Sequence, residues 1–134
     1  MRYLDANVFI YAALYSGEKG DNARKILMKL PHSEKSITST LTLDEVVWVI
    51  WKETDRKTGI LEGKNMMRMT NLDILPVEPK DINLAFKLME QYEKLKPRDA
   101  IHLGVALNSG AKTIISDDSD FDEIKEIERE KLIL

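Results

Sequence analysis

Residues 1–12 of the chain read MRYLDANVFIYA, a largely apolar stretch that contains one acidic residue, Asp5. A short strand, Arg2–Asp5, is predicted to end in an aspartate, and a helix over Ala6–Leu14 is predicted to follow directly. In an open α/β sheet, ligands bind at the carboxyl ends of strands, so Asp5 would lie at the mouth of a crevice. Aspartate is also a preferred helix N-cap, so Asp5 alone does not identify a site.

The alternation of short strands and helices continues along the rest of the chain. Further helices are predicted at about Asp21–Leu30, Thr40–Thr54, Ile60–Thr70, Asp81–Leu95 and Pro97–Gly110, and further strands at Ser36–Ser39, Leu72–Val77, Lys112–Ile115 and, last, around Ile127 and Leu132–Leu134. Strands separated by helices with short connections indicate a parallel sheet covered on both faces. The predicted fold class is α/β, a three-layer α/β/α sandwich with a central parallel sheet, in one domain over residues 1–134.

Composition narrows the classes of function. The chain has 134 residues, of which 43% are hydrophobic and 32% charged, a balance typical of one globular domain. No apolar run approaches the roughly 20 residues that cross a bilayer, so no membrane association is expected. Absence of cysteine excludes disulfides and thiolate zinc sites, and fits a cytoplasmic location. The net charge of −3 provides no general attraction for nucleic acid, so a polyanion would need a local basic patch or a bound metal ion.

Two acidic residues stand at notable positions on predicted helices. Glu45 faces away from the apolar stripe of its helix, although an exposed helical glutamate is commonplace. Asp99 lies in the first turn of a helix that is apolar almost all round, so it opens from a buried element. An acid at that position is also stabilised by the helix dipole, which is the alternative explanation for Asp99.

The last acidic segment, SDDSDFD at residues 116–122, follows the predicted strand Lys112–Ile115. A turn accounts for one or two of its acids but not for four in six positions. The spacing of Asp118 and Asp120 suggests a calcium loop. Glu123 at the sixth loop position and Arg129 at the twelfth exclude an EF-hand.

Asp5 and Asp118 both follow strands of a parallel sheet, and so are expected at the same sheet edge. Several carboxylates gathered there without Lys or Arg among them would repel one another strongly. A hard divalent cation, Mg²⁺ or Mn²⁺, takes oxygen ligands and retains waters, which suits phosphate esters. Such a site can activate a water and stabilise charge on a phosphodiester.

Four short motifs occur in order along the chain. They are Leu4-Asp5-Ala6-Asn7-Val8, Ser39-Thr40-Leu41-Thr42-Leu43-Asp44-Glu45, Arg98-Asp99-Ala100-Ile101-His102 and Ser116-Asp117-Asp118-Ser119-Asp120-Phe121. Each motif is weak alone, but the four in this order and spacing are similar to those of PIN-domain proteins. The chain most closely resembles the VapC-type toxin ribonucleases of toxin–antitoxin pairs, over essentially its whole length.

This resemblance implies the residues of the site. The metal ligands and catalytic residues would be Asp5, Glu45, Asp99 and Asp118, with Asp120 as a fifth acid, and Asn7 and Ser116 would support them by hydrogen bonds. Ser116 stands where the family usually has threonine. Because Asp117 is also acidic, the sequence leaves open which of Asp117, Asp118 and Asp120 is a ligand. The resemblance further implies a homodimer and, for the VapC branch, a small antitoxin that blocks the cleft.

Most of the other notable residues have more than one interpretation. His102 forms a D-x-x-H pair with Asp99, but oxygen-rich magnesium sites rarely use imidazole, and a packed helix histidine is favoured. Trp48 would stack a nucleobase, enter a dimer interface or pack under a helix, whereas Trp51 is expected to be structural. Further candidate RNA contacts, against the default of a solvated basic face, are Lys52, Arg56, Lys57, Lys64, Arg68 and Arg98.

The predicted function is therefore a Mg²⁺- or Mn²⁺-dependent endoribonuclease that cleaves RNA as the toxin of a toxin–antitoxin pair. A housekeeping PIN nuclease in RNA processing would use the same chemistry, and an antitoxin-like neighbouring gene would separate the two. A non-catalytic interaction module, with the acids serving only as helix caps, is the third alternative. It predicts no stabilisation by metal ions.

Overall fold

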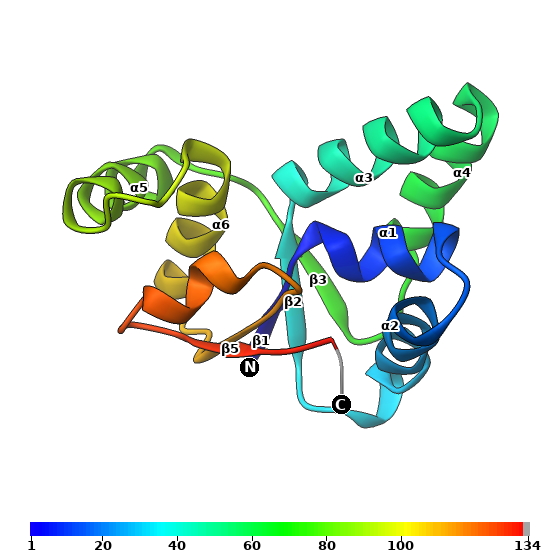
Figure 1. The fold of residues 1–134 in the computed structure, drawn as a ribbon, viewed down its shortest axis with the longest axis horizontal. Helices are drawn as coiled ribbons and strands as arrows, with labels where there is room; N and C mark the ends of the chain where they lie inside the picture. Colours follow the sequence, from blue (N-terminus) through cyan, green and yellow to red (C-terminus); the bar gives the residue numbers. More distant parts are fainter. Residues whose placement is uncertain (133–134) are drawn as a thin grey trace.

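A five-stranded parallel sheet forms the centre of the protein, which is described here for residues 1–132 from a computed structural model (Figure 1). Its strands lie in the order β3-β2-β1-β4-β5, and each neighbouring pair is parallel. The strands are β1 (Arg2–Leu4), β2 (Ser36–Ser39), β3 (Leu72–Leu75), β4 (Thr113–Ile115) and β5 (Glu128–Glu130). The predicted α/β fold class is confirmed.

Helices cover both faces of this sheet. They are α1 (Ala6–Leu14), α2 (Glu18–Met28), α3 (Thr40–Glu53), α4 (Arg56–Met67), α5 (Pro79–Gln91) and α6 (Pro97–Asn108), with short 3₁₀ turns η1 (Leu30–His32) and η2 (Ser119–Glu123). Figure 1 shows α5 and α6 on one side of the strands and α1 to α4 on the other. Within residues 1–132, none of the helices has the length and apolarity needed to cross a membrane.

Each face of the sheet has its own hydrophobic core. Successive residues of a strand point to opposite faces. Tyr3 and Ile114 therefore pack under α5 and α6, whereas their neighbours Leu4 and Ile115 pack under α1 to α4. All four side chains are fully buried. Burial on both faces explains why these strands read as short continuous apolar runs in the sequence.

The order of the strands reverses next to β1. The chain proceeds outward from β1 to β2 and β3, and then crosses back to place β4 on the other side of β1. Such a reversal opens a crevice at the carboxyl ends of the two central strands. Asp5 follows β1 and Ser116 follows β4, and the Asp5 amide donates to the Ile115 carbonyl at 3.0 Å. Both residues are therefore at the crevice.

Several element boundaries differ from the sequence prediction. Helix α2 begins at Glu18 and α4 at Arg56, inside segments expected to be loops. Asp55 starts α4 early because its side chain accepts the Thr58 amide proton at 2.7 Å. The last strand is Glu128–Glu130, not the apolar residues on either side of it. Charged side chains suit an edge strand that has a partner on one side only.

Those apolar residues instead fill the cores on the two faces of the sheet. Ile127 packs on the α5–α6 side and Leu132 on the α1–α4 side, and both are buried. The predicted strand Leu132–Leu134 extends beyond the described residues at positions 133 and 134. Helix α5 also ends earlier than predicted, at Gln91 rather than Leu95.

Gly104 allows α6 to approach α5 closely, and this contact yields a stability prediction. A Cβ atom at position 104 would lie 2.3 Å from the backbone oxygen of Asp81, so α5 and α6 would have to separate. Gly104→Ala is expected to destabilise the protein by about 2–3 kcal/mol, as overpacking does. Urea denaturation measures the change, and an unchanged midpoint would contradict the close approach.

Candidate active site

Asp5 is a buried carboxylate at the end of β1, with 6% of its surface exposed. It caps α1, since Oδ1 accepts the Ala6 amide proton at 2.8 Å, and Oδ2 accepts the Ser116 hydroxyl proton at 2.7 Å. Burial raises the pKa of Asp5, against the opposing effects of the His102 charge and these hydrogen bonds. The capping and functional interpretations of this residue are compatible, because each oxygen keeps lone pairs for a further contact.

Ser116 joins the ends of β1 and β4. Besides donating to Asp5, its hydroxyl oxygen accepts protons from the Asn7 side-chain amide at 3.2 Å and from the Asp118 backbone amide at 3.0 Å. The Asn7 side-chain oxygen, Oδ1, in turn accepts the Asp117 backbone amide proton at 3.3 Å. Asn7 and Ser116 thus connect the first motif of the chain with the last and hold the loop after β4 against Asp5.

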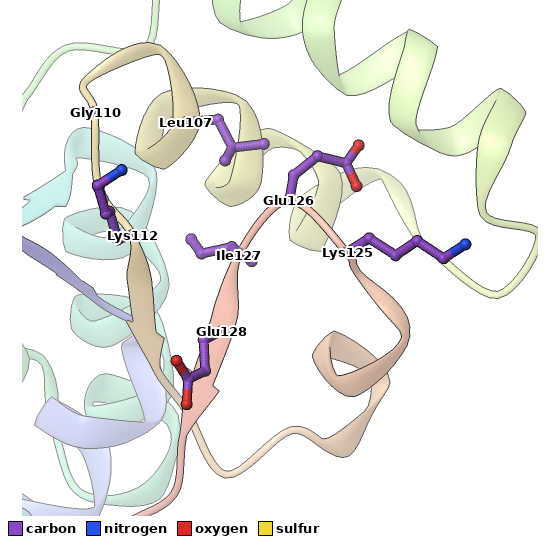
Figure 2. Close-up of a pocket in the computed structure, with 8 residues that line it drawn as sticks. Leu107, Gly110, Lys112, Lys125, Glu126, Ile127 and Glu128 are labelled. Atoms are coloured by element: carbon purple, nitrogen blue, oxygen red, sulfur yellow. The ribbon is translucent and has the colours of Figure 1, made fainter.

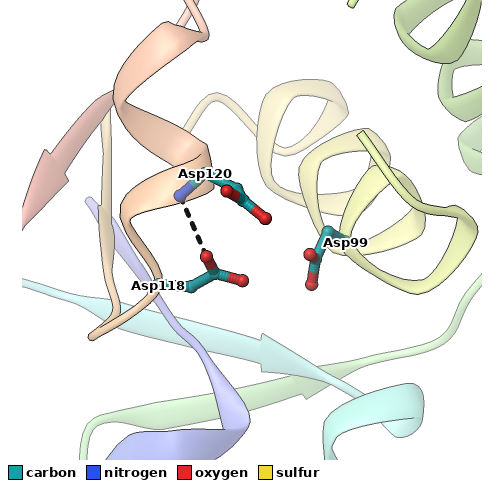
Figure 3. Close-up of side chains that lie close together, drawn as sticks. All are labelled: Asp99, Asp118 and Asp120. Carbon is teal, nitrogen blue, oxygen red and sulfur yellow. Dashed lines mark hydrogen bonds between the residues drawn. The ribbon is translucent and has the colours of Figure 1, made fainter. Parts of the chain in front are cut away.

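Three aspartates from two segments face one another beside this loop. Asp99 lies in the first turn of α6, Asp118 follows β4, and Asp120 is in η2. Figure 3 shows their carboxylates pointing toward a common space, and one oxygen of each lies within 4.8 Å of the others. The backbone amide of Asp120 also donates to Asp118 Oδ1 at 2.9 Å, which fixes the loop. Asp99, Asp118 and Asp120 together form the aspartate cluster.

Electrostatics in the aspartate cluster are unfavourable in the absence of a cation. Burial, followed by the nearby charges of Asp5 and Asp118, raises the pKa of Asp99 to about 7. The effect of Asp5 on Asp99 also indicates that the buried carboxylate at the end of β1 lies near the cluster. Such mutual repulsion is what a divalent cation relieves.

Asp117 points away from this cluster. Its Oδ2 accepts protons from Lys19 Nζ at 2.8 Å and from the Tyr11 hydroxyl at 3.0 Å. The hydrogen bond to Lys19 is the main cause of the lowered pKa of Asp117. Burial, followed by the hydrogen bond to Asp117, raises the pKa of Tyr11 to about 12. Of the three aspartates that sequence could not separate, Asp118 and Asp120 are therefore the two that lie with Asp99.

The Glu45 side chain is hydrogen-bonded to a buried histidine, His102. Its Oε1 lies 2.6 Å from Nε2 of His102, which is 0% exposed, and 3.9 Å from Nε of the exposed Arg98. The same Nε2 is 3.7 Å from Asp5 Oδ1. Although burial disfavours the charged ring, the hydrogen bond to Glu45 and the charges of Asp5 and Glu45 raise the pKa of His102. His102 is packed in a helix, as expected, but its polar atoms belong to the site.

The donor set fits a hard divalent cation. Carboxylate oxygens are the ligands that Mg²⁺ and Mn²⁺ prefer, and the aspartate cluster is the one group of three or more potential ligands that lies close together within residues 1–132. Asp5 and Glu45 are not part of this cluster but line its neighbourhood, linked by His102. Asp99, Asp118 and Asp120 are thus the residues best placed to hold an ion.

The candidate RNA contacts on α3 are exposed. Trp48 is 54% exposed, and Lys52 Nζ lies 5.8 Å from its ring centroid. Trp51, expected to be structural, is 36% exposed, and Cζ of Arg56 lies 5.2 Å from its ring centroid. The Trp51 Cβ itself packs at the tight α3–α4 contact, because a Cβ atom on Gly59 would lie 3.0 Å from it.

A groove of about 540 Å³ lies elsewhere, between the end of α6 and the starts of β4 and β5 (Figure 2). Its lining includes Lys112, Glu126, Ile127 and Glu128. These residues precede or begin their strands, whereas the acids of the site follow β1 and β4. The groove is therefore at the opposite end of the sheet and does not contribute to the acidic crevice.

Comparison with known proteins gives a consistent result. A family model for the PIN domain matches residues 2–127. No curated protein matches the chain in sequence. Among solved structures, VapC20 of Mycobacterium tuberculosis, described as a toxin that cleaves the sarcin–ricin loop, is similar with a TM-score of 0.80 and 12% identity, covering 96% of this chain and 98% of that one.

Two complexes with DNA are also similar. VapBC2 of Rickettsia felis, bound to a fragment of its promoter, gives a TM-score of 0.75 and 18% identity, with 98% of each chain covered. VapBC of Salmonella typhimurium gives 0.76 and 16%, with 98% of this chain and 97% of that one covered. At these identities the solved structures establish the shared fold alone.

Proposed function

Because the chain belongs to the PIN domain family, we propose that it is a Mg²⁺- or Mn²⁺-dependent endoribonuclease that acts as the toxin of a toxin–antitoxin pair. The observation that carries this proposal is the aspartate cluster, in which Asp99, Asp118 and Asp120 converge within 4.8 Å at the crevice. A site of oxygen ligands beside a sheet switch point suits the binding of a phosphodiester through a metal ion.

In the proposed mechanism, the chain's residues hold and orient the reactants. When bound, a divalent ion supplies Lewis acidity toward the phosphodiester and lowers the pKa of a water molecule. Asp99, Asp118 and Asp120 would ligate the ion, with Asp5 and Glu45 completing the ligands on the β1 and α3 side. Ser116 and Asn7 keep Asp5 in place, because the Ser116 hydroxyl and the Asn7 side-chain amide donate to its Oδ2 at 2.7 Å and 3.4 Å.

Substrate binding would use the cations around the crevice. Arg98 is exposed and adjoins both Asp99 in sequence and Glu45 in space, which suits contact with an RNA phosphate. Trp48, one turn beyond Glu45 on α3, and Lys52 would contact RNA further along the same helix. The overall charge of −3 makes such a local arrangement necessary.

The partners we propose are a second copy of this chain and a small antitoxin. Several structures of the same fold are toxin–antitoxin complexes, including VapBC2 of Rickettsia felis and VapBC of Salmonella typhimurium. An antitoxin that covers the crevice would keep the nuclease inactive in the cytoplasm until the antitoxin is removed. A genomic neighbour encoding a small antitoxin-like protein would favour this function over a housekeeping role in RNA processing.

Cleavage of RNA in the presence of Mn²⁺ tests the proposal, and two neighbouring aspartates provide a matched pair of variants. Asp118→Asn is expected to lower the rate by at least about 100-fold, because it removes one ligand of the aspartate cluster. Asp117→Asn should stay within about threefold of the native rate, because that side chain pairs with Lys19 and Tyr11 instead.

Excess EDTA supplies the control for metal dependence. We expect EDTA to abolish RNA cleavage by the native protein. The cleavage rates of the two variants should then both fall to the background rate, so that they no longer differ. Cleavage that is indifferent to EDTA, or that falls equally in Asp117→Asn and Asp118→Asn, would rule out the proposed mechanism.

A further inference from the structure

We propose that His102 is a positioning residue of the site, which holds Glu45 in the orientation required for metal binding. The inference rests on the proposed function and concerns one contact within it, the 2.6 Å hydrogen bond between His102 Nε2 and Glu45 Oε1. It assigns a role to a histidine that does not itself bind the ion.

Both ring nitrogens of His102 are engaged, which excludes direct ligation. Nε2 faces the Glu45 carboxylate, and Nδ1 lies 2.6 Å from the Tyr3 hydroxyl oxygen. The ring is fully buried in α6, so neither nitrogen can turn toward the crevice without breaking a buried hydrogen bond. The D-x-x-H spacing to Asp99 therefore places His102 behind the acids and not among the ligands.

The His102 ring is fixed in turn by a buried hydrogen-bond network around the Tyr3 hydroxyl. The Tyr3 hydroxyl donates to Ser39 Oγ at 2.8 Å and lies 3.4 Å from Thr42 Oγ1. Tyr3 is in β1, Ser39 ends β2 and Thr42 is in the first turn of α3, and all three are fully buried. One polar network thus connects the strand that carries Asp5, the helix that carries Glu45 and the helix that carries Asp99.

Glu45 needs such a partner more than the aspartates do. Its side chain, 16% exposed, has one more rotatable bond than an aspartate's, so fixing it in one orientation costs more conformational entropy unless a contact selects that rotamer. The bond from His102 to Oε1 selects one rotamer and leaves Oε2 free to ligate. Groups that orient a metal ligand in this way typically contribute 10–100-fold to metal affinity.

Two amide variants separate this role from simple packing. Gln at position 102 can place an N–H near the position of Nε2 and so keep the bond to Glu45, whereas the shorter Asn can reach only toward Tyr3. Calorimetric titration with Mn²⁺ is expected to show affinity about 10-fold weaker or more in His102→Asn, and within about threefold of native in His102→Gln. The melting temperature of each metal-free variant reports any structural cost separately.

A double-mutant cycle identifies the residue through which His102 acts. In a Glu45→Gln background, His102→Asn should cause no further loss of Mn²⁺ affinity, because the partner it positions has already been changed. Equal affinities of His102→Asn and the native protein, or a loss that persists in the Glu45→Gln background, would overturn the inference.

Tyr3→Phe tests the same network if His102→Asn does not fold. This variant keeps the buried aromatic ring and removes the hydroxyl that is hydrogen-bonded to Nδ1 of His102. It is expected to weaken Mn²⁺ binding about threefold. Unchanged Mn²⁺ affinity in Tyr3→Phe would contradict the inference.

Failure of the native protein to bind Mn²⁺ would refute the proposed function and the inference with it. Native binding combined with unaffected variants would refute the inference alone.

Discussion

Asp99→Asn is expected to abolish metal-dependent RNA cleavage, with a loss of about 1,000-fold or more, and at the same time to make the metal-free protein more stable. The two effects have one cause. Asp99 is partly buried beside Asp5 and Asp118, so its charge is costly in the folded protein unless a cation is bound. Asparagine keeps the shape of the side chain and removes that charge, and with it a ligand.

The pH dependence of stability follows from the direction of the same shift. The folded-state pKa of Asp99 is about 7, well above the ordinary aspartate value of 3.8. The protonated side chain is therefore favoured by folding, so its contribution is fully present below about pH 4 and is lost as pH rises through 7. In EDTA, the advantage of Asp99→Asn over the native protein should grow between pH 5 and pH 8.

Thermal melts of both proteins in EDTA measure this effect. At pH 8 we expect the variant to melt at least about 4 °C higher, which corresponds to about 1 kcal/mol for a domain of this size. Asp117→Asn is the matched control, since it removes an acid that is already paired with Lys19. A variant less stable than the native protein at pH 8 would show that Asp99 is not under electrostatic strain.

Addition of Mn²⁺ is expected to raise the melting temperature of the native protein substantially. A ligand present at 100 times its dissociation constant stabilises the folded state by about 2.7 kcal/mol. For 134 residues, this is a rise of about 8–12 °C. The rise should vanish in Asp118→Asn and Asp99→Asn, which lack one ligand each, and persist in Asp117→Asn.

The same melts discriminate against a non-catalytic interaction module. Asp5 does cap α1 and Asp118 does cap η2, so acids that serve only as caps would fit these two positions. Such a module would show no stabilisation by Mn²⁺, since a cap is satisfied by backbone amides and needs no ion. Calorimetry on the native protein would then detect no binding.

Much of the fold could be predicted because it depends on local patterns. The alternation of apolar strands with amphipathic helices is legible from residue to residue, and it identified the parallel sheet and most helix positions. Gly110, with φ +85°, lies two residues beyond the end of α6 at Asn108, close to the predicted end of that helix. The polar strand Glu128–Glu130 escaped prediction because an edge strand needs no apolar pattern to form its ladder.

The candidate site also has a part that could be predicted from the sequence and a part that depends on contacts between distant residues. The five acids could be named because their residue types and order along the chain resemble a known family. Which of them converge depends on contacts across the fold, such as the pairing of Asp117 with Lys19, 98 positions away. From the sequence, His102 is predicted to be a packed residue of an apolar helix. Its contacts with Tyr3 and Glu45 join residues that are 99 and 57 positions apart, so local sequence patterns do not show them.

By itself, the sequence determined the layered α/β architecture and the acids that carry the proposed chemistry, since local periodicity and short motifs encode both. Only the tertiary structure decided that Asp118 and Asp120 turn toward Asp99 while Asp117 turns away. It also decided that a buried histidine, and not solvent, faces Glu45. The physical reason is that side-chain direction at a sheet edge is set by which distant groups arrive there to pair with it.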